Sequence, residues 1–354
     1  MRGHLSKAVG HKLPQAQALM TADTISLPQS NPSVDVADLS LSKYRERSFW
    51  RSIWQVGSTV AVFVALWVLC WWSLDVSYLL TLAVALPTAG CLVRLFILAH
   101  DCGHGSLFAS KTANTVVGSC LGMLSFTPYH RWRKIHAIHH ATSGDLDRRG
   151  GGDVHMLTVR EYNACSRWKR LAYRIQRHPL ILFGIGPFLY FVFWQRLVLE
   201  PPAWKQERRS VHLTNLALAV IVFAMCWVFG TVPFLLVHVP VLAVASSAGV
   251  WLFYVQHHYE TTYWQRHEHW KYADASLQGS SYYKLPKILQ WFTANIGLHH
   301  IHHLDSQIPN YRLQACFDEN PPLQHVNQLT IRESIACAAL RLWDEDEQKM
   351  VPIR

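Results

Sequence analysis

The sequence predicts an all-α integral membrane protein with four transmembrane helices. Half of the 354 residues are hydrophobic and only 16% are charged. The apolar residues gather in runs long enough to cross a hydrocarbon core of ~30 Å, and basic residues flank these runs. The net charge of +10 therefore argues for anionic lipid headgroups or an acidic protein partner, and against nucleic acid.

Four apolar runs are the predicted crossings, at residues 53–74, 76–99, 211–229 and 232–256. The turn within each pair, at Asp75 and at residues 230–233, carries no Lys or Arg, whereas the outer flanks carry both. Positively charged loops stay in the cytoplasm. We therefore expect the N-terminus and the segment between the two pairs to be cytoplasmic.

A fifth apolar segment, residues 179–194, is short and is interrupted by Gly184, Gly186 and Pro187. If it crossed the membrane, the histidines near residue 300 would lie on the opposite side from those near residue 100. Basic residues flank it on both sides, so both flanks are predicted to be cytoplasmic. We expect a re-entrant or in-plane segment, and residues 116–126 are likewise too short to span.

The remaining regions divide the chain into three parts. Residues 1–41 are mixed polar without a sustained period, which predicts a disordered tail. Residues 42–311 form the membrane domain, and residues 312–354 a cytoplasmic segment in which 329–343 is predicted to be an amphipathic helix. The eight cysteines form no C-x-x-C pair, which suits reduced thiols facing a cytoplasm.

Three histidine clusters dominate the polar part of the sequence: His-Asp-Cys-Gly-His at 100–104, His-Ala-Ile-His-His at 136–140 and His-His-Ile-His-His at 299–303. Imidazole is a common ligand of iron, zinc, copper and nickel, and one zinc takes only four ligands. The clusters therefore predict two metals in an all-nitrogen shell. The eight spaced histidines are His100, His104, His136, His139, His140, His299, His302 and His303.

These clusters and their surroundings resemble the membrane fatty-acid desaturases, specifically the bacterial acyl-lipid type. The resemblance extends through residues 127–133, 141–150, 254–257, 283–286 and 309–311, and it covers roughly residues 49–311. It implies a bacterial inner-membrane protein whose metal site faces the cytoplasm. It also implies a ninth ligand within Gln256-His257, for which we prefer His257 to its neighbour His258.

Other polar residues near the clusters have open roles. Asn295 lies four residues before His299 and could ligate, orient a water or form a turn. His130 and His300 are left out of the ligand set. Isolated histidines are more often structural, namely His155, His178, His212, His238 and His325. Ligand imidazoles usually donate their second N–H to a carboxylate or carbonyl, and the nearest acids are Asp101, Asp145, Asp147, Asp153 and Glu260.

The resemblance implies an oxygen-dependent acyl-lipid desaturase in which two iron ions and O₂ act on acyl chains of membrane lipids. Electrons would come from an external ferredoxin or cytochrome, because the sequence shows no dinucleotide or haem motif. The absence of H-E-x-x-H and E-x-x-H disfavours a zinc peptidase and a carboxylate di-iron bundle. The alternatives are a hydroxylase, ketolase or alkane monooxygenase with the same boxes, and a membrane metal transporter.

Overall fold

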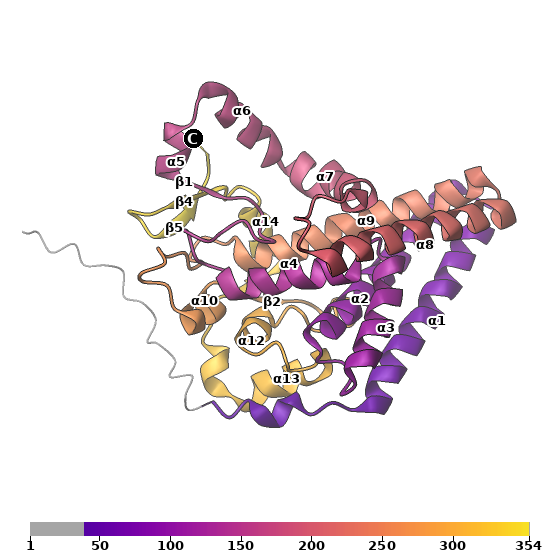
Figure 1. The fold of residues 1–354 in the computed structure, drawn as a ribbon, viewed down its shortest axis with the longest axis horizontal. Helices are drawn as coiled ribbons and strands as arrows, with labels where there is room; N and C mark the ends of the chain where they lie inside the picture. The colour runs from indigo at the N-terminus through magenta and orange to yellow at the C-terminus, as the bar shows by residue number, and fades with distance from the viewer. Residues whose placement is uncertain (1–38, 354) are drawn as a thin grey trace, which may run out of the picture. The chain divides into compact units, whose positions relative to one another are not determined.

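The structure is a computed structural model that describes residues 39–353 (Figure 1). The predicted N-terminal tail therefore lies outside the described residues, except for its last three. Of these, Leu41 is buried, and it is followed by a 3₁₀ helix, η2 (Ser42–Arg45), which packs on α13 (Asn310–Glu319).

Four helices are long and apolar enough to cross a membrane: α1 (Phe49–Ser73), α2 (Tyr78–His104), α8 (Lys205–Phe229) and α9 (Thr231–His257). They confirm the predicted all-α membrane fold with four spans, and their ends differ from the predicted ends by at most six residues. Helix α2 continues through the first histidine cluster and ends at Gly105, whose φ of 71° is easily adopted only by glycine.

Helix α2 is the centre of the membrane part. It packs against α1, α9 and α3 (Lys111–Leu124), and more of it is buried than of any other span among the described residues. Arg94 lies within α2 and turns inward. It is buried, its Nε donates to Thr59 Oγ1 at 3.0 Å, and its guanidinium lies 4.5 Å from the ring centroid of Trp291.

The segment predicted to be re-entrant forms part of an irregular arm. This arm comprises α6 (Arg167–Gln176), the π-helical η3 (Leu180–Ile185), α7 (Gly186–Val192) and the 3₁₀ helix η4 (Trp194–Arg196). The arm bends by 52° between α6 and the following segment, which fits a broken or re-entrant element. Gly186 is required in this turn, because a Cβ there would lie 2.4 Å from the carbonyl oxygen of Ile181.

Short elements cover one end of the spans. The helices are α4 (Tyr129–Thr142), α5 (Val159–Ala164), α10 (Tyr272–Gln278), α11 (Lys287–Phe292), α12 (His299–Leu304), η5 (Pro321–Gln324) and α14 (Ile331–Cys337). Strand β1 (Leu157–Thr158) pairs in parallel with β4 (Leu342–Asp344), which pairs antiparallel with β5 (Lys349–Val351). Strand β2 (Tyr282–Lys284) pairs in parallel with β3 (Gln328–Thr330).

The prediction of one amphipathic helix over residues 329–343 is wrong, because only α14 is helical there and strands lie at both ends. Thr330 and Glu333 form a capping box that starts α14. After it, the carbonyl of Leu340 accepts from the Tyr254 hydroxyl and that of Arg341 from the Tyr173 hydroxyl. These contacts with distant residues hold the chain extended, and a local pattern cannot reveal them.

Candidate metal centre

Four elements bring the histidines of the three clusters together. His100 and His104 lie in the last turns of α2, the second cluster lies on α4, and the third forms most of α12 (Figure 1). His257 is the last residue of α9. Because α2 and α9 end at the same side of the spans, their final turns and the two short helices place every cluster at one end of the membrane part.

The nine predicted site histidines form two groups. Within each group every residue offers a nitrogen, and these nitrogens lie within 4.8 Å of one another. All nine side chains are buried or half-buried. The first group is His100, His104, His136, His140 and His302; the second is His139, His257, His299 and His303.

Each His-x-x-His-His cluster is divided between the two groups. On α4, His136 and His140 belong to the first group and His139 to the second, whereas on α12 only His302 belongs to the first. A helix turns about 100° per residue, so residues i and i+4 diverge by ~40° and residues i+3 and i+4 by ~100°. The i and i+4 residues of each cluster therefore share a group, and the i+3 residue joins the other group.

The ring nitrogens converge in a way that hydrogen bonds alone cannot satisfy. His140 Nε2 lies 3.0 Å from His136 Nε2 and 3.1 Å from His302 Nε2, and His257 and His299 approach through their Nε2 atoms at 3.0 Å. A neutral imidazole has one N–H, so the single proton of His140 cannot serve both neighbours. A cation at the centre of each group would accept the lone pairs, and the donor set therefore fits a metal.

Burial keeps these imidazoles in the form that binds metals. Burial, followed by the repulsion of neighbouring histidines, holds the pKa of five of them well below the usual value of 6.5. These five are His136, His140, His299, His302 and His303. They are neutral at physiological pH, and each retains a lone pair for a metal.

Oxygen atoms behind three of the rings select the tautomer. The Nδ1 atom of His139 lies 2.5 Å from Asp153 Oδ1, that of His100 lies 3.2 Å from Asp101 Oδ1, and that of His257 lies 3.0 Å from the carbonyl of Gly279. When Nδ1–H donates to these oxygens, the Nε2 lone pair points to the centre of the group. Two of the five acids considered from the sequence, Asp101 and Asp153, thus contact the site.

Asp101 is held by a contact that the sequence analysis did not identify. Its Oδ2 accepts from the backbone N–H of Asn310 at 2.9 Å and from Asn310 Nδ2 at 2.8 Å, and all of these groups are buried. Gln55 in turn donates to Asn310 Oδ1 at 3.0 Å. Trp132 was also missed, and its ring stacks on His136 at 4.5 Å. Asn310 and Trp132 lie within the stretches that resemble desaturases. This resemblance is the only feature of the sequence that points to a role for them at the site.

Asp145 and Asp147 lie on the same loop as Asp153 but have other partners. Asp145 accepts from Arg148 at 2.5 Å, and Asp147 accepts from Arg266 at 2.7 Å. Both acids instead join this loop to the segment around His267. These two acids therefore hold the loop in place and do not orient a ring of the nine histidines.

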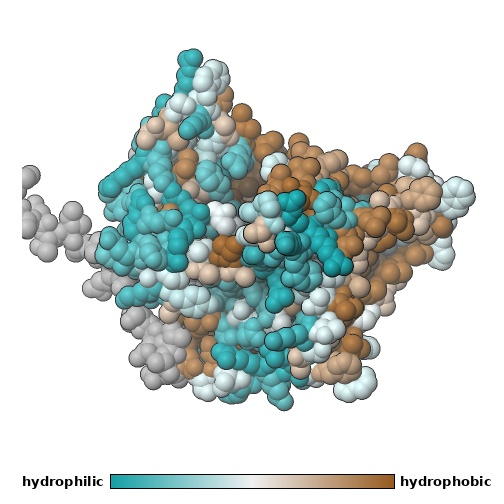
Figure 2. All heavy atoms as spheres, in the orientation of Figure 1, coloured by the Kyte–Doolittle hydropathy of each residue, from teal (hydrophilic) through white to brown (hydrophobic). Residues whose placement is uncertain are grey.

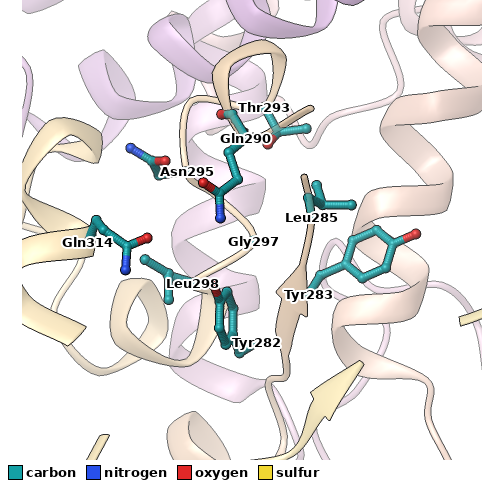
Figure 3. Close-up of a pocket in the computed structure, with 9 residues that line it drawn as sticks. All are labelled: Tyr282, Tyr283, Leu285, Gln290, Thr293, Asn295, Gly297, Leu298 and Gln314. Carbon is teal, nitrogen blue, oxygen red and sulfur yellow. Dashed lines mark hydrogen bonds between the residues drawn. The ribbon is translucent and has the colours of Figure 1, made fainter. Parts of the chain in front are cut away.

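Asn295 is a turn residue and does not share a helix face with His299. It has φ of 58° and lies before α12, and its Nδ2 donates to the Asn310 carbonyl at 3.2 Å. Figure 3 shows the loop that carries Asn295, Gly297 and Leu298 beside Tyr283. A Cβ at Gly297 would lie 2.5 Å from the Tyr283 carbonyl oxygen, so this loop passes very close to β2.

The histidines left out of the ligand set also lie outside the two groups. His258 stacks on Tyr254 at 4.4 Å, and the Nε2–H of His300 donates to the carbonyl of Leu323 at 3.0 Å. Gln206 Nε2 donates to His130 Nδ1 at 3.1 Å. The preference for His257 over His258 thus agrees with where their rings lie.

Replacing Asp153 by Asn is expected to lower metal affinity and activity by about 10–100-fold, because the charged acceptor behind His139 is lost. Metal content and activity of the purified variant would measure this. Asp147→Asn is the matched control on the same loop, and we expect it to stay within about twofold because its Arg266 contact is exposed. Equal activity of both variants would contradict the orienting role of Asp153.

Comparison with known proteins points to one family. The sequence profile of the fatty acid desaturase family matches residues 76–334. A fatty acid desaturase of Bacillus subtilis is 45% identical over 335 residues, which cover 95% of this chain and 94% of that protein. An sn-1 oleoyl-lipid 12-desaturase of Anabaena variabilis is 27% identical over 81% of this chain and 82% of its own length. An sn-1 acyl-lipid omega-3 desaturase (ferredoxin) of Synechocystis is 28% identical over 65% and 64%.

Proposed function

The chain belongs to the fatty acid desaturase family and is a fatty-acid desaturase, and from this premise we propose that its nine clustered histidines hold two iron ions that use O₂ to desaturate acyl chains of membrane lipids. The observation that carries the proposal is the pair of buried all-histidine groups at one end of four membrane-spanning helices. Each group offers four or five imidazoles, which is enough for one metal ion.

Iron is proposed because of the chemistry required. Removing two hydrogens from an unactivated alkyl chain is beyond side-chain acids and bases, and bound iron with O₂ supplies the oxidising power. The chain itself supplies position and environment. Asp101, Asp153 and the Gly279 carbonyl orient three rings, and burial limits the access of water to both groups.

An apolar groove supports access from the membrane. It has a volume of about 640 Å³ and lies along the arm, lined by Gly186, Leu189, Tyr190, Phe193, Trp194, Arg196 and Leu197. From this arm, Phe191 contacts Phe96 on α2, which contacts Trp132, whose ring stacks on His136. We propose that a lipid acyl chain approaches the metal centre along this aromatic path.

We propose an external electron donor of ferredoxin or cytochrome type. The Synechocystis relative carries ferredoxin in its name, and the net charge of +10 of the present chain suits an acidic partner. Docking to such a partner would depend on ionic strength, since exposed charges are screened by salt.

The membrane orientation is also proposed. Loops free of Lys and Arg join α1 to α2 and α8 to α9, which favours a cytoplasmic metal centre in a bacterial inner membrane. Cysteine labelling of intact cells should mark residues near 75 and 231, and should leave residues near 165, 205 and 320 unlabelled until the membrane is opened. Labelling near residue 205 from outside would contradict this orientation.

The alternative reactions differ in their products. A hydroxylase, ketolase or alkane monooxygenase could use the same histidines, and a metal transporter would need ligands near mid-membrane within the spans. Here the two groups lie at the ends of α2 and α9 and on α4 and α12, which disfavours transport.

The experiment that tests the proposal is expression in a bacterium with few unsaturated lipids, supplied with a ferredoxin. We expect a new monoene in membrane phospholipids that requires both O₂ and the electron donor, detected by mass spectrometry of methyl esters. A hydroxy or keto product without a monoene would assign the chain's chemistry to oxygenation instead.

A further inference from the structure

Helix α6 is exposed over almost its whole length, yet it carries large apolar side chains. Among its ten residues only Tyr173 is buried, while Trp168 is 67%, Leu171 46% and Ile175 54% exposed. The same helix carries four basic residues, namely Arg167, Lys169, Arg170 and Arg174. Soluble protein surfaces seldom expose such a contiguous apolar stripe, so we infer that the stripe contacts another protein or a membrane.

The apolar stripe points away from the protein. At about 100° per residue, Trp168, Leu171 and Ile175 fall within ~60° of one another, and Tyr173 lies on the opposite side. Tyr173 faces the interior, where its hydroxyl donates to the Arg341 carbonyl and accepts from the backbone N–H of Leu157 at 3.2 Å. The side of α6 that meets the protein is therefore settled, and the apolar side is the free one.

The stripe continues into a further exposed apolar surface. After α6 the arm exposes Leu180, Ile185, Leu189 and Phe193. Figure 2 shows hydrophobic atoms extending from the region of α6 and α7 toward the spans α8 and α9. The arm is fixed to the last two turns of α9, because Phe183 packs against Trp251 and Tyr254 at 4.9 and 5.0 Å. These turns lie next to His257, at the end of this span.

The charges of α6 flank the stripe as in helices that lie in a bilayer surface. Arg167 and Arg170 fall on one side of it and Lys169 on the other, and all three are exposed. An acidic protein would account for these charges but not for the outward Trp-Leu-Ile stripe. We propose that α6 is an in-plane membrane anchor that inserts this stripe into the headgroup boundary and binds anionic phospholipids through Arg167, Lys169 and Arg170.

The insertion can be tested on the full chain in nanodiscs, independently of metal binding and catalysis. A spin label at Leu171→Cys would be used after replacing the cysteines that are not buried, Cys120, Cys165 and Cys226, by alanine. A label at Glu347→Cys, on the exposed β4–β5 turn, is the aqueous control. We expect O₂ to relax the Leu171 label more strongly than a water-soluble nickel complex does. The same accessibility as at Glu347 would overturn the proposal.

The headgroup preference needs a second measurement. Spin-labelled phosphatidylglycerol would compete with phosphatidylcholine for the protein in mixed nanodiscs. In the variant carrying Arg167→Gln, Lys169→Gln and Arg170→Gln, the preference for phosphatidylglycerol should fall by at least about fivefold. This lower bound is the effect expected from the loss of a single surface charge. Arg160→Gln, whose exposed partner is Asp346, should not change it. An unchanged lipid preference with weaker coupling to the electron donor would assign α6 to an acidic protein and overturn the proposal.

Discussion

Desaturation is expected to be lost when either His302 or His303 is replaced by Ala, although the two residues are neighbours. Loss of a residue that only orients a metal ligand typically lowers activity by ~10–100-fold. We expect a larger fall here, because each variant removes a ligand itself. His302 belongs to the first group and His303 to the second, so each variant should chiefly lose a different one of the two metal ions. Product analysis together with metal content would measure both effects.

Two histidines outside the groups are the matched controls for these variants. His155 and His212 are exposed, and replacing either by Ala should leave metal content unchanged and activity within about twofold. If His302→Ala kept full metal content and full activity, the assignment of the first group would be wrong.

Replacing Glu200 by Ala is expected to destabilise the protein by about 3–5 kcal/mol, because it leaves Arg131 as an uncompensated buried charge. The two side chains form an ion pair at 2.5 Å and are both nearly inaccessible to solvent. Arg131 also donates to the carbonyls of Gln195 and Leu197, and so ties α4 to the end of the arm. Since α4 carries three of the nine histidines, activity should fall with stability, as a lower melting temperature in detergent would reveal.

Two further variants distinguish the cost of an unpaired buried charge at Arg131 from the cost of losing an ion pair as such. The double variant Arg131→Met with Glu200→Leu should recover much of the lost stability, since no charge remains unpaired. Arg160→Ala breaks the exposed pair with Asp346 and should cost no more than about 1 kcal/mol. A wild-type melting temperature for Glu200→Ala would show that the pair does not hold α4 in place.

Features set by composition and local spacing could be predicted from the sequence. The four spans follow from long apolar runs, since the bilayer sets their length. Eight of the nine clustered histidines follow from the spacing of the three clusters, and six of them form i and i+4 pairs, which one helix presents side by side. The ninth, His257, came from resemblance, since a single histidine at the end of a span has no distinguishing pattern.

Features set by distant contacts could not be predicted. Which histidine joins which group depends on how α4 faces α12, two helices that lie over 150 residues apart in sequence. Asp153 and Asp147 look alike in sequence, yet only Asp153 reaches a ring of the nine. Arg94 turns inward because Thr59 and Trp291 of α11 offer it partners. The extended backbone after α14 depends on Tyr254 and Tyr173.

The metal content of the purified wild-type chain tests the central claim most directly. Protein extracted from the membrane with a mild detergent would be analysed by elemental mass spectrometry, with the chain quantified by amino-acid analysis. The two histidine groups predict two iron ions per chain, lost together with activity on chelation. A fully active preparation with one zinc per chain and no iron would contradict the account.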